Sequence, residues 1–248
     1  MTADSLWRNG PCDFNLADNQ VHVWQASLDW PPSRLPALHQ ILSEDERAKA
    51  DRFYFAHDRL HYMVARGLLR TLLGHYLQMP PEQLHFVYNP YGKPMLSSPA
   101  DQAPLSFNVS HSGGFVLYAF ARKRTVGIDI ERMRPDLDYA EMVEHVFSPY
   151  ERREFHTLAA SQKPDGFFNA WTRKEAYIKA RGLGLALPLD QFDVTMHPDE
   201  PARLLKTAHE PLAAQQWSLC ELKVAPGYKA ALVVEGHAWQ LTCWQWPD

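Results

Sequence analysis

A strand of alternating character runs through Val126-Gly127-Ile128-Asp129-Ile130-Glu131. Side chains along a strand point alternately to its two faces, so the valine and both isoleucines share one face. Asp129 and Glu131 share the other face, about 6–7 Å apart along the strand. Two neighbouring carboxylates repel each other unless water or a cation screens them. The pattern alone also suits the solvated face of an edge strand, which needs no ion.

A third acidic residue lies in a helix whose apolar face runs from Phe168 to Ile178. Glu175 falls within this aromatic and aliphatic stripe, where an unpaired carboxylate is costly. One alternative is an ordinary pair with Lys179, which contributes only about 0.3–0.5 kcal/mol. The other is that Glu175 joins Asp129 and Glu131 around a metal ion. An all-oxygen ligand set favours Mg²⁺, with Mn²⁺ also possible.

Protein-bound Mg²⁺ is usually completed by substrate phosphates, so the acids predict a phosphate-bearing ligand. Basic residues recur on one face of a helix expected from about residue 56 to Leu77, namely Arg59, Arg66 and Arg70. Acids interspersed with them suit a solvated, salt-bridged helix equally well. No GxxxxGK[ST] loop is present, which argues against a P-loop nucleotidase.

The predicted elements occur in two groups. Ser43 and Glu46 form a capping box that begins a helix, and the helix ending near Leu77 follows. Strands are expected at 21–26, 84–88, 105–110, 115–122 and 126–131, helices at 140–147, 149–160 and 165–181, and strands at 192–195, 217–223, 229–234 and 241–246. Helices followed by strands thus occur twice. This order predicts an α+β fold of two similar halves, residues 1–122 and 123–248.

Composition excludes several classes of protein. The 248 residues are 46% hydrophobic and 22% charged, which is typical of a globular chain. A net charge of −4 argues against general nucleic-acid binding, which needs a basic field. The longest apolar run, 115–121, is far shorter than the roughly 20 residues of a membrane helix. Cys12, Cys220 and Cys243 include no CxxC pair, so we expect a reducing, cytoplasmic setting without disulfides or a zinc cluster.

Several of these segments resemble the Sfp-type 4'-phosphopantetheinyl transferases of the holo-acyl-carrier-protein synthase superfamily. The resemblance is carried by residues 91–94 (Tyr-Gly-Lys-Pro), 107–112, 126–131 and 168–180, with a weaker match at 147–151. The Gly-Ile-Asp-Ile-Glu strand followed by the Trp-x-x-Lys-Glu-x-x-x-Lys helix is specific, whereas neither motif would be specific alone.

The resemblance implies that coenzyme A donates its 4'-phosphopantetheine arm to a serine of an apo acyl, peptidyl or polyketide carrier protein, releasing 3',5'-ADP. It implies halves related by a pseudo-two-fold axis, with coenzyme A in the cleft between them. Two such halves in one chain need no second copy, so we expect a monomer.

The resemblance also implies roles for individual residues. Asp129, Glu131 and Glu175 match the metal ligands, and Glu151 matches a general base. The lysines on the pyrophosphate side match Lys174 and Lys179, and Lys179 is also a catalytic candidate. Ligands of the adenosine and 3'-phosphate end match Lys93, Ser110, His111 and, more loosely, Lys49. At His61 the family often has arginine, so Arg59 or Arg66 would supply the missing charge.

Two other functions use the same residues. A Mg²⁺-dependent phosphohydrolase would employ the carboxylates with water as nucleophile, and a non-catalytic module would bind carrier proteins without turnover. An apolar stripe of Met142, Val143, Val146 and Phe147 is either core or a groove for a carrier helix.

Overall fold

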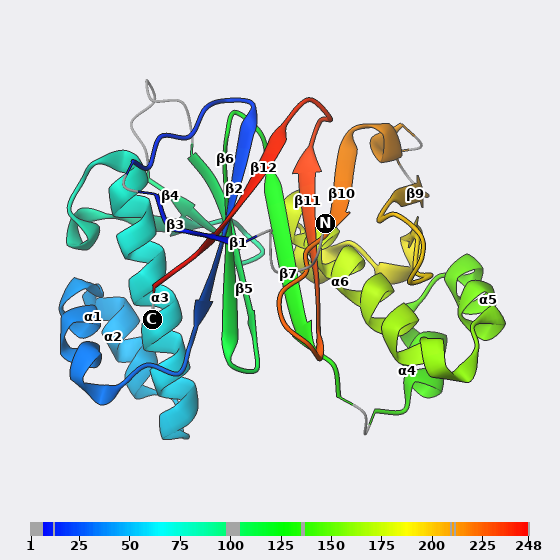
Figure 1. Cartoon of the computed structure of the whole chain (residues 1–248), viewed down its shortest axis with the longest axis horizontal. Helices are drawn as coiled ribbons and strands as arrows, with labels where there is room; N and C mark the ends of the chain where they lie inside the picture. The colour runs from blue at the N-terminus through cyan, green and yellow to red at the C-terminus, as the bar shows by residue number, and fades with distance from the viewer. Residues whose placement is uncertain are drawn as a thin grey trace.

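The computed structural model describes residues 7–11, 13–97, 105–134, 137–208, 210 and 212–247. It confirms the predicted α+β class, because two groups of helices and strands follow one another along the chain. The two main sheets lie side by side in the middle of the molecule, and helices cover their outer faces (Figure 1).

The first group forms a five-stranded sheet of order β1-β12-β2-β6-β5. Its strands are β1 (Trp7–Asn9), β12 (Gln240–Gln245), β2 (Gln20–Ser27), β6 (Phe115–Arg122) and β5 (Leu105–Ser112). The helices of this half are α1 (Leu35–Ile41), α2 (Glu44–Asp51) and α3 (Ala56–Leu77), and a small hairpin pairs β3 (Phe86–Tyr88) with β4 (Pro94–Leu96). The capping box predicted for Ser43 and Glu46 is present at the start of α2.

The second group forms an antiparallel sheet of order β10-β11-β7. Its strands are β10 (Trp217–Glu221), β11 (Tyr228–Glu235) and β7 (Val126–Arg132). Between β7 and β10 the chain forms α4 (Tyr139–Val146), α5 (Pro149–Thr157), α6 (Lys163–Arg181) and the short pair β8 (Phe192–Val194) and β9 (Leu204–Thr207).

Three hydrophobic cores stack these elements into four layers. Tyr118 and Phe120 of β6 point toward α3, while the alternate Leu117 points to the second sheet. Ile128 of β7 meets Leu117 in the core between the sheets. A third core joins α6 to the outer face of β11. Since the apolar face of β7 is used between the sheets, its acidic face is left for α6 and β5.

The last strand departs from the predicted division of the chain. β12 lies between β1 and β2 of the first sheet and runs parallel to both. A boundary between residues 122 and 123 therefore separates β12 along the chain from the sheet that it joins. The sequence also gave no sign of β1, β4, β9 or α1, which are at most seven residues long.

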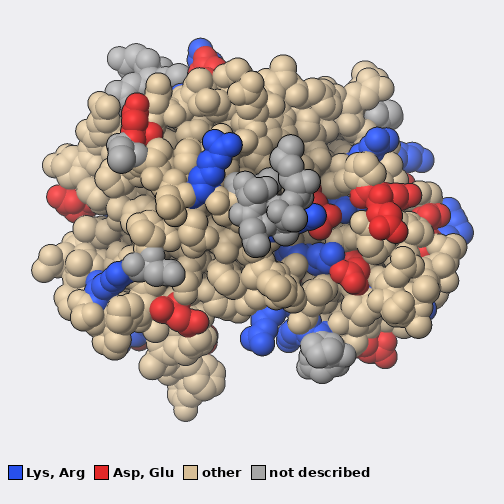
Figure 2. Space-filling view, in the orientation of Figure 1, with Lys and Arg blue, Asp and Glu red and all other residues tan. Residues whose placement is uncertain are grey.

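The described surface is mixed in charge. On the face in Figure 2, lysine and arginine side chains are interspersed with aspartate and glutamate. No helix among the described residues is long and apolar enough to cross a membrane. Cys220 and Cys243 are free thiols, and Cys12 lies outside the described residues.

Candidate active site between the two halves

Polar side chains of β5 bridge the two sheets. Asn108 Oδ1 accepts a hydrogen bond from the Ile128 N–H at 2.8 Å, and Ser112 Oγ accepts one from the Arg132 N–H at 3.1 Å. Ser110 lies between them on the same face of β5, and its Oγ donates to Asp129 Oδ1 at 2.9 Å. These bonds hold β7 against the side chains of β5. Asn108 and Ser112 are not among the predicted site residues, although their spacing around Ser110 marks one face of a strand.

Gly127 lets helix α6 approach the same face of β7. A Cβ atom on Gly127 would lie 2.1 Å from the Ala176 carbonyl oxygen and 2.3 Å from the Ala180 nitrogen. Only glycine permits this backbone contact. The close approach brings Glu175 and Lys179 of α6 beside Asp129.

Asp129 is the most buried acid of the cluster. Lys179 Nζ lies 2.5 Å from its Oδ1, while Oδ2 is buried and has no hydrogen-bond partner among the described residues. Burial raises the pKa of Asp129 above its ordinary value, although the charge of Lys179 opposes the shift. A buried carboxylate with one free oxygen is a group that a cation would stabilise.

Glu175 and Lys179 line a cavity of about 310 Å³ whose opposite wall is the turn from Tyr91 to Pro94. Glu175 is half-buried and makes no hydrogen bond or ion pair within the described part of the chain. Desolvation, followed by the charge of Asp129, raises its pKa. Lys179 keeps 29% of its side chain exposed and so presents its charge to the cavity.

The three acids offer the oxygen ligands that a hard divalent ion prefers, but in this conformation they lie too far apart to bind one ion together. Asp129, Glu131 and Glu175 supply only carboxylate oxygens, and Glu131 already accepts a bond from Ser112 Oγ at 2.8 Å. The three residues do not place their oxygens within 4.8 Å of one another; among the described residues only Asp29, His57 and His61 do so with their ligand atoms. The predicted convergence on one point is thus incomplete, and the Lys179 ammonium holds Asp129 instead.

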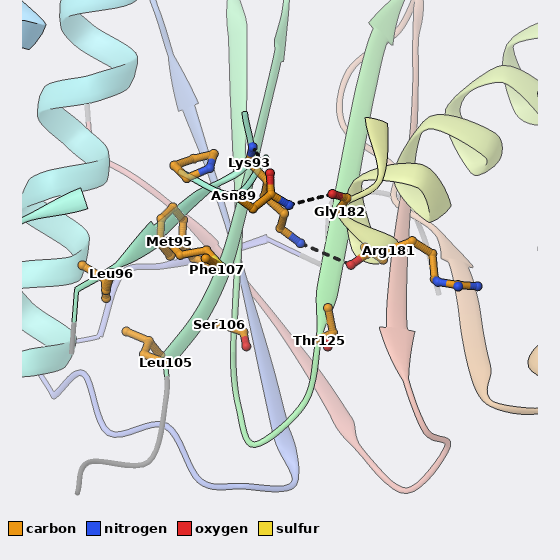
Figure 3. Close-up of a pocket in the computed structure, with 12 residues that line it drawn as sticks. Asn89, Lys93, Met95, Leu96, Leu105, Ser106, Phe107, Thr125, Arg181 and Gly182 are labelled. Carbon is orange, nitrogen blue, oxygen red and sulfur yellow. Dashed lines mark hydrogen bonds between the residues drawn. The ribbon is translucent and has the colours of Figure 1, made fainter. Parts of the chain in front are cut away.

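Lys93 joins the halves rather than facing a phosphate. Its Nζ donates to the carbonyl oxygens of Lys179 at 2.6 Å and of Val126 and Ala180 at 3.3 Å. Burial lowers the pKa of Lys93 to about 8. Beside it, Asn89 Nδ2 donates to the Gly182 carbonyl at 2.7 Å, and both side chains point toward the end of α6 across a second cavity (Figure 3). The Lys93 ammonium therefore binds backbone carbonyls in this structure, and its predicted phosphate role stays a prediction.

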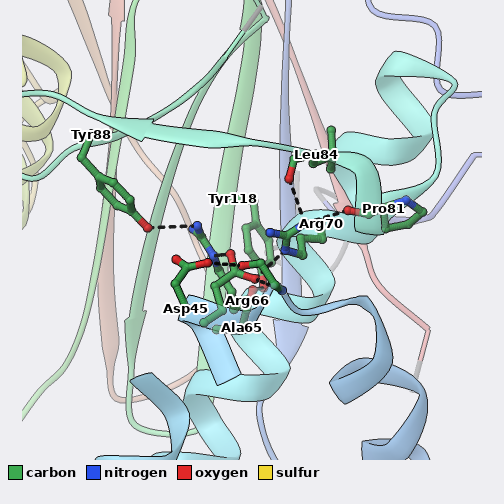
Figure 4. A network of polar contacts seen from close by, with 10 residues as sticks. Asp45, Ala65, Arg66, Arg70, Pro81, Leu84, Tyr88 and Tyr118 are labelled. Atoms are coloured by element: carbon green, nitrogen blue, oxygen red, sulfur yellow. Dashed lines mark hydrogen bonds and ion pairs between the residues drawn. The ribbon is translucent and has the colours of Figure 1, made fainter. Parts of the chain in front are cut away.

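Arg66 is also engaged within the protein (Figure 4). Its Nε donates to Glu46 Oε1 and its Nη2 to the Tyr88 hydroxyl at 3.2 Å. Arg70 Nε reaches the other oxygen of Glu46 at 2.6 Å, and all three charged side chains are buried. Burial alone would raise the pKa of Glu46, but the bond from Arg70 and the charge of Arg66 lower it. In this structure the Arg66 guanidinium contacts Glu46 and Tyr88, and its predicted contact with a phosphate stays a prediction.

Glu151 and Lys174 lie outside the cavity and are fully buried. Lys174 Nζ is 2.7 Å from Glu151 Oε2 and also donates to the carbonyls of Leu189 and Phe192. Glu151 closes the capping box of α5 with Ser148, and its Oε1 accepts from the Val194 N–H at 2.9 Å. In this conformation neither residue can reach a substrate, which argues against the general-base role of Glu151 and the pyrophosphate role of Lys174.

The remaining predicted anion ligands differ in their surroundings. His61 Nε2 lies 3.1 Å from Asp29 Oδ1, and a neighbouring carboxylate disfavours phosphate. His111 is exposed overall, and its pKa is lowered by desolvation of the ring and by the charges of Lys179 and His61. Lys49 is exposed, with its ammonium 5.3 Å from the centre of the Tyr62 ring.

Sequence comparisons match both halves of the chain to known proteins. A sequence profile described as the 4'-phosphopantetheinyl transferase superfamily matches residues 125–233, and one described as the N-terminal part of 4'-phosphopantetheinyl transferases matches residues 28–123. The chain is 39% identical over 240 residues to the 4'-phosphopantetheinyl transferase HetI of Nostoc sp., covering 97% of this chain and 98% of the relative. It is 32% identical over 193 residues to the 4'-phosphopantetheinyl transferase Sfp of Bacillus subtilis, covering 77% and 81%.

The chain therefore belongs to the 4'-phosphopantetheinyl transferase superfamily, which confirms the resemblance seen in the sequence. It is an enzyme that transfers a phosphopantetheinyl group to a carrier protein.

Proposed function

We propose that coenzyme A binds in the cavity between the Tyr91–Pro94 turn and α6, and that Asp129, Glu131 and Glu175 hold Mg²⁺ beside its diphosphate. The observation that carries this proposal is the position of Lys179. Its ammonium contacts the buried Asp129 and also lines the cavity, 310 Å³ in volume, together with Glu175. Lys179 thus links the buried Asp129 to the cavity that Glu175 lines.

In the reaction, the serine oxygen of the apo carrier attacks the phosphorus next to the pantetheine arm. The bond to the leaving oxygen breaks, and 3',5'-ADP departs with the electron pair. Lys179 would offset negative charge that develops on the diphosphate. Mg²⁺, when bound, would neutralise charge on the same oxygens. Ser110 donates a hydrogen bond to Asp129 and so orients its carboxylate. His111 stays a predicted ligand of the nucleotide end.

The proton of the carrier serine needs an acceptor other than Glu151 in this conformation. The fully buried Glu151 already accepts bonds from Lys174, Ser148 and Val194. Its predicted catalytic role would require α5 to move. The monomeric state and the cytoplasmic location remain predictions.

Mass spectrometry of a panel of apo acyl, peptidyl and polyketide carriers tests the proposal. With coenzyme A and Mg²⁺ we expect a carrier to gain the mass of phosphopantetheine, and EDTA to prevent the gain. Rapid release of 3',5'-ADP without any carrier would instead favour a phosphohydrolase. Carrier affinity without any mass gain, unchanged by EDTA, would favour a non-catalytic binding module.

A further inference from the structure

A second group of ligand-type side chains lies apart from the carboxylates of the active site. Asp29 follows β2, while His57 and His61 stand one turn apart at the start of α3. Residues four apart on a helix lie on one face, so both imidazoles are directed to the same side. One ligand atom from each of the three residues lies within 4.8 Å of the other two.

The spacing is close to that of a metal site. His61 Nε2 and Asp29 Oδ1 are 3.1 Å apart. Two ligands of a tetrahedral zinc ion are about 3.3 Å apart, given bond lengths of about 2.0–2.1 Å. The ring centres of His57 and His61 are 3.8 Å apart. The ligand atom of His57 lies within 4.8 Å of those of His61 and Asp29, and the exposed His57 side chain is free to turn toward an ion.

Part of the site is fixed in advance by the fold. His61 is 9% exposed and is held by Asp29, whose backbone N–H donates to Ser27 Oγ at 3.2 Å. The side chain of Asp29 is 70% exposed, so an ion can enter from solvent. A buried imidazole beside an accessible carboxylate attracts a cation and repels an anion.

We infer that Asp29, His57 and His61 form a binding site for one divalent transition-metal ion of the Zn²⁺, Co²⁺ or Ni²⁺ class. Imidazole nitrogens favour these ions over Mg²⁺, which prefers oxygen ligands. Water would complete the coordination, because three protein ligands leave at least one position open. The site is separate from the Asp129 cluster, and its existence does not depend on the proposed transferase reaction.

Calorimetric titration of the full chain with ZnCl₂ tests the inference. Excess Mg²⁺ is present, so that the carboxylates of the active site are occupied. We expect one Zn²⁺ per chain, with affinity reduced roughly tenfold or more in His57→Gln and in Asp29→Asn, because each loses a direct ligand. His39→Gln removes another exposed histidine, on α1, and should bind Zn²⁺ like the unchanged protein.

A second measurement uses Co²⁺, whose visible absorption changes when imidazole and carboxylate bind it. The unchanged chain and His39→Gln should show this spectrum, and His57→Gln should lose it. Thermal unfolding without metal checks that each variant is folded, which the exposure of His57 and Asp29 favours. The inference is overturned if the unchanged chain binds no ion, or if His57→Gln and Asp29→Asn bind Zn²⁺ as tightly as His39→Gln.

Discussion

Lys174 and Glu151 form an ion pair of 2.7 Å in which neither side chain has exposed surface. Burial raises the pKa of Glu151 and lowers that of Lys174, and the charge of each partner opposes these shifts. The pair connects α5 to α6 and, through the carbonyls of Leu189 and Phe192, to the start of β8. It is therefore placed to position the C-terminal half rather than to exchange a proton with a substrate.

A double-mutant cycle separates these roles. Glu151→Gln and Lys174→Met should each lower the free energy of unfolding by about 3–5 kcal/mol, since each leaves one buried charge unpaired. The double variant should recover part of the stability and of the transfer rate. Urea unfolding and single-turnover transfer measure the two quantities. A double variant that is stable yet as slow as Glu151→Gln would instead support the general-base role.

Glu175→Gln should abolish Mg²⁺-dependent transfer while the protein stays folded. The side chain faces the cavity without a partner in the described structure, so little stability is lost. Loss of a direct metal ligand should lower the rate by at least about 10–100-fold. The rate is measured as carrier mass gain across a Mg²⁺ series. The control Glu141→Gln changes an exposed acid of α4 and should leave the rate unchanged, whereas equal rates in both variants would refute the metal assignment.

Gly127→Ala should damage both stability and catalysis. The new methyl group would collide with the backbone of α6, and overpacking of this kind costs about 1–3 kcal/mol or more. Displacement of α6 would also move Lys179 from Asp129, so transfer should slow. Gly114→Ala is the matched control, because its nearest contact is the flexible end of Asp29 at 3.1 Å. Similar melting temperatures for the two variants would show that α6 adjusts to the added methyl group.

Stability should fall in acid through Glu46. Its pKa is lowered in the folded protein, and the ordinary value is about 4.3. The carboxylate therefore contributes stability that is fully present above about pH 4.3 and is lost as the pH falls through its folded pKa. Urea unfolding from pH 7 to pH 3 measures this contribution. Glu46→Gln should be less stable at pH 7, and its free energy of unfolding should fall less between pH 7 and pH 3. If its free energy of unfolding depended on pH as that of the unchanged chain does, Glu46 would not be the source of the acid sensitivity.

Much of the fold could be predicted because apolar periodicity extends over long elements. The helix expected to end near Leu77 and the strand from Phe115 to Arg122 agree with α3 and β6. The three-residue strands β1 and β4 could not be found, since so short a segment is a strand only through its partner. The pattern of residues 241–246 predicts a strand, but it does not determine which of the two sheets that strand joins.

Candidate site residues could be predicted where they lie on one face of a strand or helix. They could not be predicted where their role depends on which other side chain or carbonyl they contact. The strand and helix patterns singled out Asp129 and Glu175, whereas the contact of Lys179 with Asp129 appears only in the structure. Arg66 and Lys93 are cations at plausible positions, but their sequence patterns look the same whether they face a phosphate, a carboxylate or backbone carbonyls. Glu46 and the end of α6 occupy them here.

The position of β12 has a consequence for synthesis of the chain. Residues 240–245 pair with β2 on one edge and with β1 on the other. Until the ribosome has released this segment, the backbone edge of β2 that it covers remains without its native partner. The first sheet is thus completed only after the strands of the second sheet have been synthesised, and removal of residues 240–245 would expose a strand edge prone to self-association.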